Sequence, residues 1–221
     1  MQQYPMEELH STLPLLDAEE MRILGSLMEK SRATPEYYPM TVNGLTAACN
    51  QKTSRRPVVQ YDEQTVVLAL DKLRSKGLVS TATGGGSRTV KHKHNIALHY
   101  QLVPAEIAIL SMLMLRGPQT PGELNTNSGR LYEFDSLEEV QDTLEKLSNS
   151  SPAFVRQLAR LSGQKEARYT QLFNEEQITD IAAPKTDEGY EALAARVQVL
   201  EHELTELKQS FAELMKEWTG N

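Results

Sequence analysis

The hydrophobic positions of this 221-residue chain follow a helical pattern that occurs twice. Apolar residues three or four positions apart lead into a Thr-Pro pair, and the same arrangement returns later in the chain. At one offset of 86, Glu20, Ile23, Leu24, Leu27, Met28, Thr34 and Pro35 recur as Glu106, Ile109, Leu110, Leu113, Met114, Thr120 and Pro121. The repeat predicts one structural unit used twice.

The first copy predicts three helices followed by a β hairpin. Asp17 is expected to cap the first helix, Thr41 lies at the start of the second, and Asp62 caps the third. Strands are expected at residues 78–82 and 88–96, on either side of the turn TGGGS. This order of elements is typical of a winged helix.

The second copy predicts the same elements with a shorter connection. Val140, Leu144 and Leu147 match the third-helix positions of the first copy at an offset of 74 instead of 86. The first copy therefore has 12 more residues (86 minus 74) between its first and third helices. We expect a mainly α fold with small β hairpins (α+β): an N-terminal tail at 1–15, then tandem winged-helix domains at 16–100 and 101–182.

The C-terminal segment predicts a coiled-coil helix. After a linker at 183–188, apolar residues of 189–219 alternate in steps of three and four from Tyr190 to Trp218. The charges beside this seam favour a parallel homodimer, but the helix could instead fold back over its own domains. The residues expected at the dimer interface are Leu193, Val197, Leu200, Leu204, Leu207, Phe211 and Leu214.

Composition limits the possible classes of protein. With Cys49 as its one cysteine, the chain lacks the residues for a disulfide framework or a cysteine-based zinc site. It shows no signal peptide and no apolar run of about 18 residues, which predicts a cytoplasmic protein without membrane contact. No catalytic triad, metal-ligand spacing or nucleotide-binding loop is recognisable, so we expect no enzyme activity, no cofactor and no metal.

Charge is distributed unevenly along the chain. The net charge is −7, yet residues 50–94 hold nine bases and three acids. We therefore expect this segment to contact double-stranded DNA, because cations on a winged helix bind phosphates and release counterions. The candidate DNA-contacting residues are Lys52, Arg55, Arg56, Gln64, Arg74, Lys76, Arg88, Lys91 and Lys93.

The third helices weaken this hypothesis. Helical projection places Gln64, Leu68, Asp71 and Ser75 on the outward face of the first copy's third helix, and this face is not basic. The outward face of the corresponding helix in the second copy holds Glu138, Asp142 and Glu145, so we do not expect that helix to enter a DNA groove.

Several other residues allow two interpretations. His92 and His94 share one face of a strand, and a solvated face is favoured over a metal site. Cys49 is expected to be a buried, inert thiol and not a nucleophile. Tyr37 and Tyr38 could cover the core or present aromatic anchors to a partner, and covering the core is favoured.

A cluster at the turn of the second copy could form a protein interface, together with Arg116 before it. The favoured interpretation is that Tyr132 and Phe134 pack between the two repeats, with an ion pair between Arg130 and Glu133.

Three sequence motifs indicate a family. They are TPEYYPMTVNGLTAACNQKTSRRPV at 34–58, RGPQTPGEL at 116–124 and LYEF at 131–134. With these motifs the chain resembles the YceH-like family of bacterial proteins over nearly its whole length. The resemblance implies a tandem winged-helix fold, and it implies no reaction and no catalytic residues.

Two functions remain open from the sequence. The leading hypothesis is a dimeric, non-enzymatic DNA-binding protein, such as a transcriptional regulator, that uses the loop and wing of its first copy. The alternative is a protein-protein interaction adaptor that uses both winged helices and the C-terminal coil. A continuous positive face around the first copy would favour DNA binding, whereas acids from residues 1–49 lying among these cations would favour the adaptor.

Overall fold

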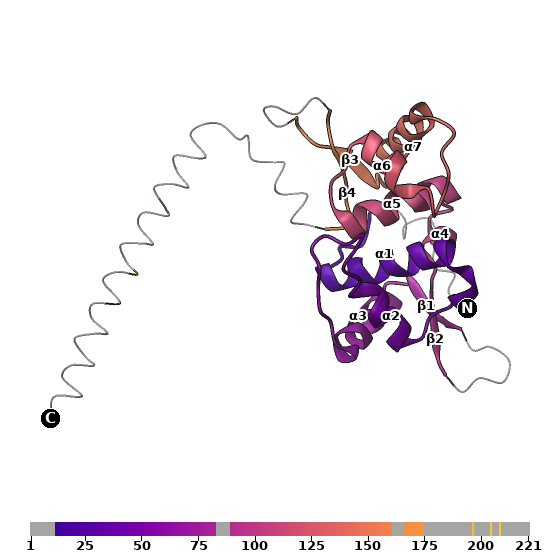
Figure 1. Ribbon diagram of the computed structural model, residues 1–221, viewed down its shortest axis with the longest axis vertical. Coiled ribbons are helices and arrows are strands. Elements are labelled where there is room, and N and C mark those ends of the chain that lie inside the picture. Colours follow the sequence, from indigo (N-terminus) through magenta and orange to yellow (C-terminus); the bar gives the residue numbers. More distant parts are fainter. Residues whose placement is uncertain are drawn as a thin grey trace, which may run out of the picture. The chain divides into compact units, whose positions relative to one another are not determined.

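The computed structural model describes residues 12–82, 89–160 and 166–174, together with Arg196, Leu204 and Lys208. The chain divides into two compact units, 1–179 and 180–221, and both sequence repeats lie in the first. The described part is mainly helical and holds two antiparallel two-stranded hairpins (Figure 1). The predicted α+β class is confirmed.

The first repeat forms three main helices and then a hairpin. Its elements are α1 (Ala18–Ala33), η2 (Pro35–Tyr37), α2 (Val42–Cys49), α3 (Glu63–Ser75), β1 (Val79–Ala82), β2 (Lys91–His94) and α4 (Ile96–His99). Side chains of Asp17, Thr41 and Asp62 accept backbone N–H groups at the starts of α1, α2 and α3, as predicted. Gly77, with φ at +72°, follows the C-terminal end of α3 in the left-handed conformation.

The second repeat has the same order of main elements. It consists of α5 (Pro104–Arg116), α6 (Pro121–Ser128), α7 (Leu137–Asn149), β3 (Val155–Gln157) and β4 (Tyr169–Gln171). Thr120 and Glu123 cap α6 reciprocally, each accepting the backbone N–H of the other.

Each hairpin pairs with the segment that leads into the second helix of its repeat. β1 and β2 align Val79 with His94, and β3 and β4 align Val155 with Gln171. Met40 then forms an antiparallel bridge with His92, and Gln119 forms one with Tyr169. Met40 and Gln119 each precede the residue that caps the second helix, so the two repeats share this detail as well as the order of their elements.

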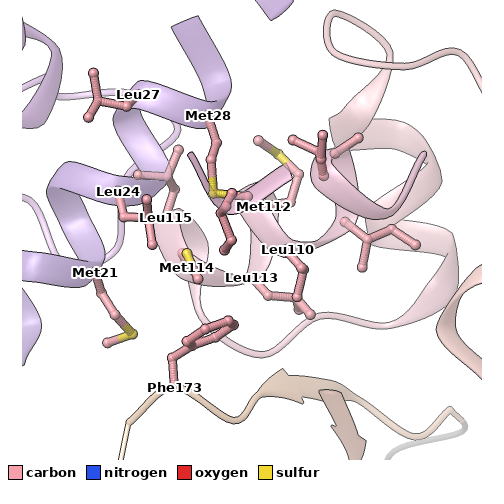
Figure 2. Packing of buried hydrophobic residues seen from close by; sticks show 14 of the residues in the cluster. Met21, Leu24, Leu27, Met28, Leu110, Met112, Leu113, Met114, Leu115 and Phe173 are labelled. Carbon is pink, nitrogen blue, oxygen red and sulfur yellow. The ribbon is translucent and has the colours of Figure 1, made fainter. Parts of the chain in front are cut away.

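The first helices of the two repeats, α1 and α5, pack against each other in the centre of the fold. Every residue from Glu20 to Glu29 is buried, as is every residue from Ala105 to Leu115. Figure 2 shows leucines and methionines of both helices filling the space between them. Because neither helix leaves an exposed face along these stretches, the repeats share one hydrophobic core.

Gly25 and Ser111 lie at a close approach of α1 and α5. The hydroxyl of Ser111 donates to the carbonyl oxygen of Gly25 at 3.2 Å, and a Cβ on Gly25 would lie 3.1 Å from Leu115 and Met114. The two residues are 86 positions apart, which is the offset of the repeat. A contact between equivalent positions is what a two-fold relation between the repeats would place at its axis.

Among the described helices, none combines the length and the apolar character needed to span a bilayer.

Candidate functional site

The outward face of α3 is apolar at its centre. Val67 is 40% exposed and Leu68 is 57% exposed, and the polar residues Gln64, Asp71 and Ser75 are exposed along the same helix. The predicted orientation of α3 is therefore confirmed. The face offers apolar and neutral contacts together with one exposed carboxylate.

The cations of α3 are paired with carboxylates. Lys72 Nζ lies 2.8 Å from Asp17 Oδ2, and Arg74 Nη2 lies 2.7 Å from Asp71 Oδ1. Lys76, which follows the helix, contacts Glu20 Oε1 at 2.6 Å, and the Glu20 side chain is only 2% exposed. Acids from the N-terminal part of the chain thus lie among the cations predicted to bind DNA.

Arg55 does not lie on the surface, which corrects its assignment as a DNA contact. The residue is 3% exposed, and its guanidinium donates to both carboxylate oxygens of Glu29, at 3.1 and 2.6 Å. Burial by itself raises the pKa of Glu29, but the hydrogen bonds and charge of Arg55, together with Lys30, outweigh that effect and lower it. Arg55 is thus part of the interior.

The longer connection of the first repeat, residues 50–61, is held by interior polar groups. Asn50 exchanges two hydrogen bonds of 2.8 Å with the backbone of Tyr61. Buried Arg22 donates to the carbonyl oxygen of Cys49 at 3.0 Å and to that of Pro57. The Arg56 N–H donates to the Leu115 carbonyl oxygen at 2.8 Å, which attaches the loop to the second repeat.

The remaining candidate cations of the first repeat are available at the surface. Lys52, Arg56 and Lys93 are exposed, and Lys91 is partly buried. Within the described part of the chain, none of the four has a carboxylate within ion-pair distance. Arg88 lies in 83–88, outside the described residues.

The histidines of β2 face inward, contrary to the predicted solvated face. His92 is 8% exposed, and His94 Nε2 lies 3.1 Å from Ser31 Oγ. Burial lowers the pKa of His94 to about 4, so its ring is neutral at physiological pH. Tyr38 packs against the core in this region, and the His94 backbone N–H donates to Tyr38 Oη at 2.8 Å.

Cys49 and Tyr37 lie in contrasting environments. The Cys49 thiol is fully buried beside Ser26, and burial raises its pKa to about 11, as expected for an inert thiol. Tyr37 is 72% exposed, so only Tyr38 packs against the core. The prediction that both tyrosines cover the core is wrong for Tyr37.

The contacts of Tyr132 lie within the second repeat instead of between the repeats, and the predicted ion pair of this turn does not form. Tyr132 donates to Glu139 Oε1 at 2.7 Å, and its ring meets that of Phe134 edge-on, with 4.8 Å between centroids. In the described structure Arg130 is exposed and makes no ion pair with Glu133. On α7, Glu138, Asp142 and Glu145 are exposed, as the helical projection predicted.

A cleft of about 670 Å³ lies between the two repeats, beside the 50–61 loop of the first repeat. Its walls come from the C-terminal half of α1, residues 51–54, the end of α5, and α6 with the turn after it. Arg116 lies in this cleft and donates to Asn127 Oδ1 at 2.6 Å and to Ser54 Oγ at 2.7 Å. Arg116 and Arg130 were predicted to belong to one cluster, and both line this cleft. No sequence pattern predicted the cleft itself.

The predicted dimerisation residues fall almost entirely outside the described residues. Leu193, Val197, Leu200, Leu207, Phe211 and Leu214 lie there. Leu204 is helical and 51% exposed. Arg196 and Lys208, which flank the predicted seam, are also helical and exposed.

The described residues contain no group of three or more histidine, cysteine, aspartate or glutamate side chains placed to hold a metal ion.

Comparison with known proteins identifies the family. Residues 16–164 match the family described as proteins of unknown function, DUF480. A UPF0502 protein from Solibacter usitatus is 45% identical over 91% of this chain and 97% of its own length. A UPF0502 protein from a Shewanella species is 43% identical over 92% of this chain and 99% of its own length. Another from Pectobacterium carotovorum is 43% identical over 90% of this chain and 98% of its own length. The chain therefore belongs to this bacterial family of unknown function, the YceH-like family that its motifs indicated.

Proposed function

We propose that this protein is a non-enzymatic interaction adaptor in which two tandem winged helices hold a protein partner. Support for the winged-helix assignment comes from the order of three helices and a hairpin in each repeat, and from the bridges of Met40 and Gln119 to the hairpins. A DNA-binding winged helix contacts its ligand through the third helix, and we propose the same surface for a protein partner. The outward face of α3 is therefore the proposed docking surface.

One observation favours a protein partner over DNA: the cations of α3 are paired with carboxylates, while Val67 and Leu68 are exposed. Exposed apolar side chains framed by polar residues suit the centre of a protein interface. A partner with an apolar surface would cover Val67 and Leu68 and leave the surrounding ion pairs at the rim.

The charge around α3 also argues against entry into a DNA groove. Residues 62–76 hold three acids and three bases, and Asp17, Glu19 and Glu20 beside them bring the local sum to −3. A phosphate backbone approaching this surface would meet net repulsion. A continuous positive face would favour DNA binding, whereas acids lying among the cations favour an adaptor.

DNA binding is the second candidate, and the unpaired cations of the loop and wing favour it. Lys52, Arg56, Lys91 and Lys93 have no ion-pair partner in the described part of the chain. If these cations make four phosphate contacts, raising the salt concentration from 50 to 200 mM would reduce DNA affinity about a hundredfold.

We also propose that the C-terminal helix forms a parallel homodimer. The exposure of Leu204, which lies in the predicted apolar seam, supports this proposal, because an apolar seam position is covered when a coiled coil forms. Light scattering of the full chain and of Leu204→Asp tests it. We expect a dimer for the wild type and a monomer for the variant, and a monomeric wild type contradicts the proposal.

The adaptor is tested by quantitative affinity purification from a native bacterial lysate after nuclease digestion. We expect a protein partner that is recovered in a fixed ratio to the bait and that binds the Leu68→Asp variant about thirtyfold more weakly, which is the effect of losing an interface hot spot. Leu98→Asp is the matched control, since Leu98 is 82% exposed on α4.

The same material separates the two candidates. If the partner binds Leu68→Asp and wild type equally, the α3 surface is not the docking site. Titration of duplex DNA at several salt concentrations tests the second candidate, with Arg56→Glu combined with Lys93→Glu as the variant. DNA binding that falls steeply with salt and is lost in that double variant, without any protein partner, would replace the adaptor by a DNA-binding function.

A further inference from the structure

We propose that the cleft between the two repeats binds a small, phosphate-bearing molecule. The cleft has a volume of about 670 Å³. Sites for small molecules and cofactors in proteins measure about 300–1,000 Å³, so the volume suits a ligand of this size. The site differs from the α3 surface and does not depend on the adaptor proposal.

The cleft is positively charged within an acidic protein. Its lining includes the cations Lys30, Lys52, Arg116 and Arg130 and a single carboxylate, that of Glu29. Glu29 pairs with Arg55 at 2.6 Å and with Lys30 at 3.3 Å. The other three lining cations have no carboxylate within ion-pair distance in the described part of the chain. The uncompensated charge therefore favours an anionic ligand, whereas the chain as a whole has a net charge of −7.

Arg116 provides the central donor group of the cleft. Its two amino groups donate to Asn127 Oδ1 and Ser54 Oγ, and both of these acceptors are neutral. Its Nε is buried and has no hydrogen-bond partner among the described residues. A guanidinium has five N–H donors, and an oxyanion is the acceptor that matches its planar fork.

A chain of hydrogen bonds fixes the orientation of Arg116. Asn127 Nδ2 donates to Gln119 Oε1 at 2.8 Å, and Gln119 Nε2 donates to the carbonyl oxygen of Met112 at 3.1 Å. Gln119 is 4% exposed, so this support lies inside the second repeat. Arg116 is thus held in place before any ligand arrives, which reduces the entropic cost of binding.

The first repeat completes the site through a strained residue. Ser54 has a φ of +61°, in the left-handed region that residues other than glycine rarely adopt. In this conformation its hydroxyl accepts from Arg116 across the boundary between the repeats. Backbone strain of this kind tends to occur at ligand sites.

The remaining side chains favour phosphate as the anionic group. Lys52 and Arg130 line the cleft and are exposed, and in the described part of the chain neither has an ion-pair partner. Two flexible cations beside a fixed guanidinium suit a group with several oxygens and more than one negative charge. The volume of the cleft favours a small phosphorylated molecule over duplex DNA, whose backbone needs an open surface.

Isothermal titration calorimetry of the full-length protein with inorganic pyrophosphate tests this site. We expect saturable binding at low salt that weakens tenfold or more in Arg116→Gln, the effect of removing a charged hydrogen-bond donor. Because Arg116 also joins the two repeats, the double variant Lys52→Gln, Arg130→Gln provides a second test with exposed positions, and we expect a similar loss of affinity. Arg160→Gln, an exposed arginine of the second repeat outside the cleft, is the matched control and should bind as the wild type does.

Two further titrations identify the ligand chemistry. Citrate separates phosphate from carboxylate recognition, and a short DNA duplex separates a small ligand from a nucleic-acid backbone. The proposal is overturned if pyrophosphate does not bind at millimolar concentration, or if Arg160→Gln weakens binding as much as the cleft variants. It is also overturned if citrate or the duplex binds more tightly than pyrophosphate at the same ionic strength.

Discussion

Replacing Arg55 by methionine should destabilise the protein strongly, although this arginine lies in a loop. Its guanidinium donates to Glu29 twice, to the carbonyl oxygen of Ala48 twice and to that of Ser54 once. Methionine fills similar space without replacing any of these bonds. The substitution leaves the Glu29 carboxylate, whose side chain is 9% exposed, without its main partner.

The structure sets the size of this effect. Removing one partner of a buried ion pair costs about 3–5 kcal/mol, because the other charge stays buried without compensation. Lys30 Nζ remains 3.3 Å from Glu29 Oε2 and compensates in part, which favours the lower end, about 3 kcal/mol. In a protein of this size, that loss lowers the melting temperature by about 6–12 °C.

Urea unfolding followed by circular dichroism measures the change in the free energy of unfolding. Arg56→Met is the matched control, since the neighbouring arginine is exposed and its side chain makes no ion pair in the described structure. We expect the control to lie within about 0.5 kcal/mol of the wild type. Equal stabilities of the Arg55→Met and Arg56→Met variants would refute the assignment of Arg55 to the interior.

The pH dependence gives an independent check. The lowered pKa of Glu29 means that its contribution to stability is present above about pH 4.5 and is lost as the pH falls through the lower folded value. In Arg55→Met, burial is no longer opposed by the arginine, so Glu29 is protonated more easily. The stability difference between wild type and variant should therefore shrink as the pH falls from about 5 towards 3.

Three further predictions concern the core and the wing. Gly25→Val should lower the unfolding free energy by about 1–3 kcal/mol in urea, because its Cβ would lie 3.1 Å from Leu115; wild-type stability would contradict the close approach. Cys49, with a pKa of about 11, should react with a thiol reagent at pH 8 only as fast as the protein unfolds, and rapid native labelling would contradict its burial. Because the pKa of His94 is lowered to about 4 by burial, stability should be lost as the pH falls from about 6.5 towards 4; an equal loss in His94→Gln would exclude this cause.

Local sequence signals predicted the elements of both repeats. The caps Asp17, Thr41 and Asp62 and the helical spacing of the leucines depend on residues within one or two turns, so they are visible in the sequence itself. The positions of the hairpins followed from turn residues for the same reason. These parts of the fold needed no knowledge of long-range contacts.

The role of individual cations could not be predicted in this way. Arginine in a polar loop is usually exposed, and the partner that buries Arg55 is Glu29, 26 positions away on another helix. Glu29 itself is buried because α1 packs on all sides, which only the presence of the second repeat makes possible. The pairing of Lys72 with Asp17 and of Lys76 with Glu20 likewise joins residues more than 50 positions apart.

The cleft follows from the way in which the two repeats differ. Gly25 and Ser111 occupy equivalent positions of the two repeats and contact each other, as residues at the axis of a symmetric dimer do. The 12 additional residues belong to the first repeat alone, and they bring Lys52 and Ser54 to one side of the boundary. Two identical repeats would form this cleft twice, whereas the 12 additional residues of the first repeat allow it to form once. The insertion thus places its cations where a ligand would contact both repeats at the same time.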